Sequence, residues 1–242
     1  MSRDKKIDAA VTSLPYEIIG FVNKDKEKWH ECWSDGRDPL SLPHPWRVIA
    51  CGPPNSGKST VVKNLILRAS PMFERIIIVY PGGRTGTQEY SEFDDCAEYL
   101  DYIPPPEFFP SSRKKRGEAN FTKTLCVVDD FELKSLNKVQ RSNLDRLTGH
   151  VSTHRHTSVI LCSQEFYNFP TGVRRNASMY ILWKPRDFLS TKTISSRVGE
   201  DMDQLFELCP GPHDSIWLDL SPGSPMPIRK NGYELIRKHC TQ

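Results

Sequence analysis

The sequence has little net charge and no long apolar run. Its 33 lysines and arginines stand against 30 aspartates and glutamates, which leaves a formal charge of +3. This small excess does not by itself indicate a nucleic-acid-binding protein. Any such function must therefore depend on local clusters of charge. No apolar run approaches the roughly 20 residues that a membrane-spanning helix needs. No apolar segment follows the charged first residues either, and we therefore expect a soluble protein without a secretion signal or a membrane-spanning segment.

The sequence also lacks the usual signatures of disulfide and metal scaffolds. Its seven cysteines are scattered, with no C-x-x-C pair, and three lie inside apolar runs, which is typical of reduced, buried thiols in an intracellular protein. His150, His154 and His156 lie close together, but no cysteine or carboxylate completes a familiar ligand spacing. We therefore favour solvated or DNA-facing imidazoles over metal ligands.

One stretch matches a phosphate-binding loop. The pattern G-x-x-x-x-G-K-[ST] follows an apolar run at residues 48–51 and precedes apolar residues at helical spacing. Glycine permits the tight turn in which backbone N–H groups converge on one anion, and the dipole of the following helix points at the same phosphates. We expect Lys58 to reach the β- and γ-phosphates and the hydroxyl of Ser59 to bind Mg²⁺. The residues expected to bind the nucleotide are Gly52, Pro53, Pro54, Asn55, Ser56, Gly57, Lys58, Ser59 and Thr60.

Apolar runs alternate with amphipathic segments after this loop, which predicts a parallel sheet with right-handed helical crossovers. A chain of 242 residues fits one α/β domain. We assign residues 46–242 to this domain and residues 1–45 to an N-terminal arm, which we expect to cover an edge of the sheet rather than to contact a neighbouring subunit. Strands are predicted at residues 18–22, 75–80, 124–128, 157–164, 178–183 and 215–220, and helices at residues 25–33, 88–100, 134–147 and 203–208.

Two of the predicted strands end in polar side chains. The strand at residues 124–128 is followed by Asp129 and Asp130, and the strand at residues 157–164 ends in Gln164. A buried strand ending in carboxylates is the expected companion of a phosphate loop, so we expect Asp129 to hold Mg²⁺ and Asp130 to orient or deprotonate the attacking water. The amide of Gln164 suits a sensor of the γ-phosphate, because it donates to phosphate and accepts from water at once.

Hydrolysis at such a site commonly needs a further cation at the γ-phosphate, often supplied by a neighbouring subunit. Two placements are available: Arg155, just before the strand that ends in Gln164, and the pair Arg174 and Arg175 after it. The sequence does not choose between them, because each fits a DNA contact or a surface ion pair equally well. Four consecutive cations at residues 113–116 fit a solvated loop, a nuclear-import address or a phosphate contact.

Taken together, these motifs resemble those of the FtsK/HerA-superfamily genome-packaging ATPases of double-stranded DNA viruses, particularly the compact poxvirus-like, virophage and Maverick-type versions. The resemblance runs from about Pro45 to about Ile236 and is seen in the phosphate loop and in residues 127–131, 155–164 and 214–219. An Arg-His element leading into a strand with terminal glutamine is more telling than the phosphate loop, which very many NTPases share. Paired aspartates match the viral branch, whereas cellular relatives usually place a glutamate at the second position.

The resemblance implies a fold, an activity and partners. The fold is an α/β P-loop NTPase of the ASCE type, with a central, mostly parallel sheet flanked by helices. In it the strand ending in Gln164 lies between the strands that carry the phosphate loop and the aspartate pair. The implied activity is an ATPase that uses ATP and Mg²⁺ to drive double-stranded DNA into a preformed viral capsid. The implied partners are further copies of the chain, in a ring of five or six, and the capsid or its portal vertex. The implied location is the nucleus or a cytoplasmic virus factory of an infected cell, or the virion.

Three other functions share parts of this pattern. Another nucleic-acid motor, such as a helicase or replication ATPase, would use the same site residues and differ in its substrate. A small-molecule kinase usually carries an arginine-rich lid and no glutamine-tipped strand, so Gln164 argues against it. A GTPase switch would normally recognise guanine with N-K-x-D, and the nearest match, residues 137–140, lacks the aspartate.

Overall fold

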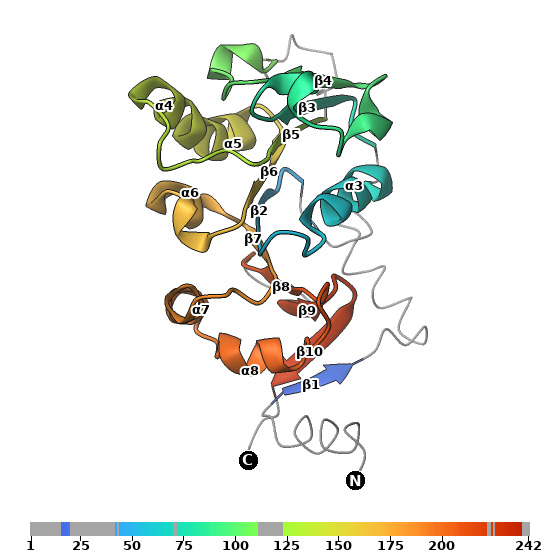
Figure 1. Cartoon of the computed structure of the whole chain (residues 1–242), viewed down its shortest axis with the longest axis vertical. Coiled ribbons are helices and arrows are strands. Elements are labelled where there is room, and N and C mark those ends of the chain that lie inside the picture. Colours follow the sequence, from blue (N-terminus) through green and yellow to red (C-terminus); the bar gives the residue numbers. More distant parts are fainter. Residues whose placement is uncertain are drawn as a thin grey trace.

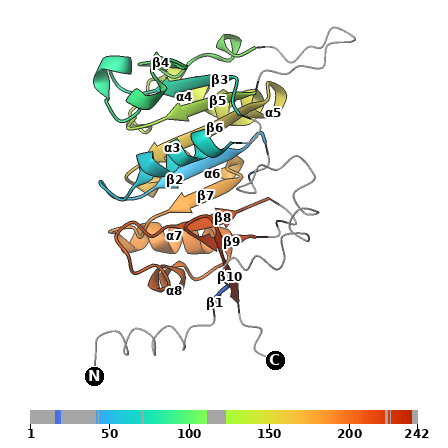
Figure 2. The ribbon, with the colours of Figure 1, turned by 90° about the vertical axis from the view of Figure 1, so that its right-hand side faces the viewer.

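Runs rich in valine, isoleucine and leucine form the central strands of one sheet, because side chains that are buried on both faces must be apolar. This computed structural model describes residues 16–19, 42, 44–69, 72–110, 123–221, 224 and 226–238. Within these residues the sheet has ten strands, in the order β1-β10-β9-β8-β7-β2-β6-β5-β3-β4 (Figure 2). The strands are β1 Tyr16–Ile19, β2 Arg47–Cys51, β3 Arg75–Val79, β4 Ala97–Leu100, β5 Thr124–Val128, β6 Thr157–Ser163, β7 Met179–Leu182, β8 Ile216–Asp219, β9 Ile228–Lys230 and β10 Glu234–Lys238.

The six neighbouring strands from β7 to β4 run parallel to one another. Strand β6 lies between β2, which leads into the phosphate loop, and β5, which ends at Asp129. The order implied by the sequence resemblance is thus confirmed, and the carboxyl ends of these three strands meet at one edge. Strands β8, β9, β10 and β1 extend the sheet with antiparallel pairs. The strand predicted at residues 215–220 is therefore present as β8, but it runs antiparallel to its neighbour.

Helices cover both faces of the sheet. Helix α3 lies on one face, and α4, α5, α6 and α7 lie on the other (Figure 1). The alternation along β2 serves both layers: Val48 and Ala50 pack in the same cluster as Val62 of α3, whereas Ile49 packs in the cluster that contains Leu144 of α4. The helices are α3 Lys58–Arg68, α4 Lys138–Arg146, α5 Ser152–His154, α6 Thr171–Asn176, α7 Phe188–Val198 and α8 Met202–Glu207.

The prediction of a helix at residues 88–100 is wrong. This segment contains a short 3₁₀ turn, Ser91–Phe93, and then β4, which pairs with β3 at the edge of the sheet. Tyr90 and Phe93 are buried, and both join the apolar cluster on the α3 face. Their spacing is compatible with a helix, but residues 97–100 pair with β3, and this tertiary contact decides the local structure.

Other predicted elements are present with altered bounds. The helix predicted at residues 134–147 begins four residues later, because the side chain of Asn137 accepts a hydrogen bond from Gln140 N at 2.9 Å and caps α4. Val139 is 69% exposed and so does not belong to the expected apolar side of this helix. Beyond Arg146 the chain continues as a π-helical turn and the short α5. The elements α5, α6, α7, β9 and β10 were not predicted.

The N-terminal arm is described only in part. Strand β1 overlaps the strand predicted at residues 18–22 and pairs with β10 at the edge of the sheet. The helical turns predicted at residues 25–33 and the four cations at residues 113–116 lie outside the described residues. No helix of the described part of the chain is both long and apolar enough to cross a membrane.

Candidate nucleotide-binding site

The phosphate loop connects the end of β2 to the start of α3, and its geometry requires both of its glycines. Gly57 has a φ of 98°, a left-handed conformation that other residues rarely adopt. Gly52 lies against Trp183, so that a Cβ atom at this position would stand 2.7 Å from the Trp183 Cβ. The loop therefore turns tightly over the carboxyl end of β2 and presents the N-terminus of α3 to the space beyond it.

The ammonium group of Lys58 folds back across this loop. Its Nζ atom donates to the carbonyl oxygen of Gly52 at 2.8 Å and to that of Pro53 at 2.9 Å. These contacts hold the positive charge on the inner side of the loop, next to the amides at the start of α3. An anion at this position would meet the lysine charge and the helix dipole together.

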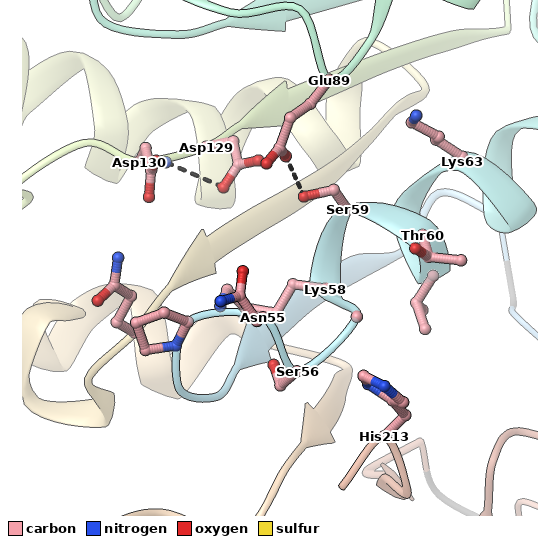
Figure 3. A pocket seen from close by; sticks show the side chains of 14 residues that line it. Asn55, Ser56, Lys58, Ser59, Thr60, Lys63, Glu89, Asp129, Asp130 and His213 are labelled. Carbon is pink, nitrogen blue, oxygen red and sulfur yellow. Dashed lines mark hydrogen bonds between the residues drawn. The ribbon is translucent and has the colours of Figure 1, made fainter.

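The loop and the neighbouring strand ends enclose a pocket of about 780 Å³ (Figure 3). Ten of the residues predicted for the site line it, and they come from three different segments of the chain. The predicted residues Gly52 and Pro53 do not line the pocket, but their carbonyl oxygens accept hydrogen bonds from Lys58. The ten are Pro54, Asn55, Ser56, Gly57, Lys58, Ser59, Thr60, Asp129, Asp130 and Gln164, and the remaining lining residues are Val61, Lys63, Glu89 and His213.

Asp129 is the buried carboxylate of the site and is 4% exposed. Its Oδ2 atom accepts a hydrogen bond from the hydroxyl of Tyr90 at 2.6 Å, and its Oδ1 atom accepts one from the backbone N–H of Asp130 at 2.9 Å. Burial raises the pKa of Asp129, and the nearby charges of Asp130 and Glu89 act in the same direction, while the Tyr90 hydrogen bond opposes them. A divalent cation next to Asp129 would favour its ionised form.

Asp130 stands at the mouth of the pocket in an unusual backbone conformation. Its φ is 56°, which lies in the left-handed region. The hydroxyl of Tyr80 donates to Asp130 Oδ2 at 3.0 Å. Burial and this contact raise the pKa of Tyr80 to about 12, so that the phenol keeps its proton and remains a donor at neutral pH. Asp129 is thus buried, whereas Asp130 is exposed to solvent.

Gln164 follows the last residue of β6 and is exposed to the pocket. The neighbouring strand end is connected to the segment after Asp130 by Asn168, which is 7% exposed. The Asn168 amide nitrogen donates to Ser163 Oγ at 2.9 Å and to the carbonyl oxygen of Phe131 at 3.1 Å. Asn168 Oδ1 accepts from Lys134 N at 3.2 Å. This single side chain therefore links the residue before Gln164 to the residue after Asp130.

The donor set fits Mg²⁺, which prefers oxygen ligands and one or two carboxylates. Ser59 and Asp129, the two ligands predicted from the sequence, line the same pocket. The hydroxyl of Ser59 donates to the carboxylate of Glu89, which is a further oxygen donor at the same place. The described residues contain no group of three or more histidine, cysteine or acidic side chains that could hold a metal ion, so at this site the nucleotide phosphates and water would have to complete the ligand set. In particular, the sequence cluster of His150, His154 and His156 forms no such group.

The three candidate arginines do not line this pocket. Arg155 precedes β6 and therefore lies toward the opposite edge of the sheet, where its guanidinium donates to the carbonyl oxygens of Pro106 and Phe109 at 2.6 and 2.5 Å. The guanidinium of Arg174 lies 5.4 Å from the ring centre of Phe166. Arg175 is exposed near the start of β2. None of the three side chains serves the pocket of its own chain in this arrangement.

Among the site residues that were missed in the sequence are Glu89, Tyr90, Asn168 and His213. Glu89 and Tyr90 fall in the segment that was wrongly predicted to be a surface helix. The available signal was topological, since a loop that follows the carboxyl end of β3 must emerge at the same edge as the phosphate loop. His213 comes from the connection between α8 and β8, and no pattern in the sequence relates it to the loop that it faces.

A phosphate loop between a parallel strand and a helix, with an added strand between it and the aspartate-tipped strand, defines the P-loop ATPase fold of the ASCE type. No protein-family model and no curated protein matches the sequence. Solved structures share the fold. The DNA-packaging ATPase B204 of Sulfolobus turreted icosahedral virus is 16% identical, with a TM-score of 0.51 over 76% of this chain and 95% of B204.

Two further structures extend this comparison. The genome packaging NTPase B204 of Sulfolobus turreted icosahedral virus 2, in complex with AMPPCP, is 19% identical, with a TM-score of 0.53 over 77% of this chain and 97% of that one. The cytoplasmic domain of the type VII secretion ATPase EccC from Thermomonospora curvata is 14% identical, with a TM-score of 0.55 over 82% of this chain and 26% of EccC. These likenesses confirm the fold that the sequence resemblance implied.

Proposed function

We propose that this chain is an ATP-hydrolysing motor that moves double-stranded viral DNA into a preformed capsid. The observation that carries the proposal is the convergence of the phosphate loop, the aspartate pair and Gln164 on one pocket of about 780 Å³. The extent of the structural match supports packaging over other motor functions. This chain spans nearly the whole of the viral packaging ATPases, 95% and 97%, but only 26% of the secretion ATPase.

The residues of the site divide the chemistry of ATP hydrolysis among them. Amides at the start of α3 and the ammonium of Lys58 bind the β- and γ-phosphates and withdraw charge from them. Mg²⁺, held by Ser59 and Asp129, would neutralise the charge that develops on the phosphate oxygens. Asp130 orients or deprotonates the attacking water, and Gln164 hydrogen-bonds the water and the γ-phosphate.

A cation at the γ-phosphate is then supplied by a neighbouring copy of the chain. This part of the proposal is supported by the position of Arg155, Arg174 and Arg175 outside the pocket of their own chain. A ring of five or six subunits around the duplex would bring one of them to the next pocket. The proposed partners are therefore duplex DNA, other copies of the chain and the capsid or its portal vertex. The proposed location is the nucleus or virus factory of an infected cell, or the virion.

Steady-state ATP hydrolysis tests the proposal. We would measure the rate per subunit at low salt, with and without duplex DNA, over a range of protein concentrations. The proposal predicts stimulation by DNA and a rate per subunit that rises with concentration, because the active site is completed at an interface. A rate that is independent of DNA and flat with concentration would indicate a monomeric NTPase that acts on another substrate.

The alternative of a helicase or replication ATPase needs a separate experiment, because it would share every site residue. A forked duplex with one labelled strand distinguishes the two. A packaging motor is expected to hydrolyse ATP on the blunt and the forked duplex equally and to release no single strand. Strand release that depends on ATP would favour the helicase.

A further inference from the structure

The loop between β3 and β4 reaches into the nucleotide pocket through two adjacent residues, Glu89 and Tyr90. Two contacts fix it in place. The side chain of Thr87 is buried and accepts a hydrogen bond from the backbone N–H of Glu89 at 3.0 Å. The hydroxyl of Tyr99, on β4, donates to the carbonyl oxygen of Tyr90 at 2.7 Å. Thr87 and Tyr99 therefore hold the backbone of both residues, independently of the phosphate loop.

Each of the two side chains contacts one expected magnesium ligand. The carboxylate of Glu89 accepts the hydrogen bond of the Ser59 hydroxyl (Figure 3). The hydroxyl of Tyr90, whose side chain is fully buried, donates to Asp129 Oδ2 at 2.6 Å. Ser59 and Asp129 lie 70 residues apart in the sequence, yet neighbouring residues of one loop hold both of them.

These contacts orient ligand atoms without competing for them. A serine hydroxyl has one hydrogen and two lone pairs, so donation of the hydrogen to Glu89 leaves the lone pairs directed away from that carboxylate. A carboxylate oxygen likewise accepts more than one partner, so Asp129 Oδ2 keeps acceptor capacity after it has bound the Tyr90 hydroxyl. Groups that hydrogen-bond metal ligands fix their orientation and raise metal affinity.

We propose that Glu89 and Tyr90 are positioning residues for Mg²⁺, acting through Ser59 and Asp129. This inference rests on the proposed function, since it assigns a role at the same site. Glu89 holds the hydroxyl of Ser59 and adds a negative charge beside the cation. Tyr90 fixes the buried carboxylate of Asp129. The β3–β4 loop thereby links the binding of the cation to the strand at the edge of the sheet.

The test measures binding of ADP rather than turnover. We would titrate full-length Glu89→Gln and Tyr90→Phe with a fluorescent ADP analogue, first in EDTA and then at increasing Mg²⁺. In EDTA the affinity should remain within about twofold of wild type, because the amides of the loop and Lys58 bind the phosphates. The Mg²⁺ concentration at half-maximal effect should rise about tenfold in each variant. Glu107→Gln and Tyr102→Phe are matched controls, since both residues are exposed and lie outside the pocket, and they should leave both values unchanged.

Each alternative outcome is distinguishable. An unchanged Mg²⁺ midpoint in Glu89→Gln overturns the inference, and so does an equal loss of affinity with and without Mg²⁺, which indicates a structural role of the loop. Glu89 is exposed, so its variant should keep the thermal unfolding midpoint of wild type and decides the question even if Tyr90→Phe unfolds. If wild type itself binds no ADP under either condition, the proposed function fails first.

Discussion

At the scale of single residues, the site separates binding from chemistry. Lys58 and the start of α3 form a positive cradle for phosphate, whereas Asp129, Asp130 and Glu89 form a negative side that needs a cation between the two. The cradle follows from the sequence, because a phosphate loop is a local motif whose residues are contiguous. The support of the negative side does not, because Glu89 and Tyr90 reach Ser59 and Asp129 only after the sheet has formed.

Removal of the lysine charge should abolish hydrolysis. In Lys58→Ala the pocket loses the ammonium that the loop carbonyls hold at 2.8 and 2.9 Å. We expect the ATPase rate to fall by at least about a hundredfold, as for other groups that stabilise charge in a transition state. Malachite-green phosphate release measures this rate, and Lys63→Ala, another lysine lining the pocket, serves as the control. Turnover near the wild-type rate in purified Lys58→Ala would refute the site assignment.

Replacement of Asp130, the exposed carboxylate, should stop hydrolysis but preserve ATP binding. Asp130→Asn preserves the shape of the side chain and its tolerance of positive φ. We expect ATP affinity within about twofold of wild type and a loss of hydrolysis of about 10²- to 10⁴-fold, the range for a general base. Equilibrium binding of a fluorescent ATP analogue and single-turnover hydrolysis give the two values. A loss of ATP binding, or hydrolysis at the wild-type rate, would show that the aspartates have been misassigned.

At the scale of elements, the parallel strands were predictable and the edge elements were not. Strands β2, β3, β5 and β6 are apolar runs bounded by polar residues, so that their burial on both faces is visible in composition alone. Strand β4 is short and half-buried, and its pairing with β3 is a long-range contact that no local pattern reports. Asn137 similarly decides where α4 begins, through a cap that a periodicity analysis does not see.

A histidine in the segment that leads into β2 should make the free energy of unfolding depend on pH. His44 Nδ1 and Ser158 Oγ, on β6, lie 2.8 Å apart. Burial lowers the pKa of His44 from 6.5 to about 4, and the charges of Lys123 and His156 act in the same direction. The unfolded chain therefore binds more protons between these values, so the free energy of unfolding should fall as pH drops from about 6.5 to about 4. Urea unfolding of wild type and His44→Gln across this range measures the difference. Parallel pH profiles of the two proteins would contradict the prediction.

At the scale of the whole molecule, the sheet separates the pocket from the arginines that are expected to complete it. The phosphate loop lies at the carboxyl ends of the parallel strands, and Arg155 and Arg175 lie near their amino ends, about 16 Å away for a strand of five residues. A closed ring places one such edge against the pocket of the next copy. Strand order and fold class could be inferred from the sequence resemblance, but the partner of each arginine depends on an interface between chains.

Mixing of two inactive variants should restore activity if the arginine acts across that interface. Arg175 is the exposed candidate, whereas Arg155 and Arg174 already contact their own chain. Equal amounts of Arg175→Ala and Lys58→Ala would form intact composite sites at about a quarter of randomly assembled interfaces, because each site takes one residue from each subunit. Hydrolysis at fixed total protein should therefore recover up to this fraction. No recovery at any mixing ratio would argue against a role of Arg175 in trans.

The left-handed backbone of Asp130 limits how this position can change during evolution. Aspartate, asparagine and glycine enter this region at small cost, whereas longer side chains do so with strain. Replacement of Asp130 by glutamate is therefore expected to add strain of up to about 1–2 kcal/mol to the turn after β5. Related chains that share this turn are therefore expected to accept asparagine or glycine at this position more readily than glutamate.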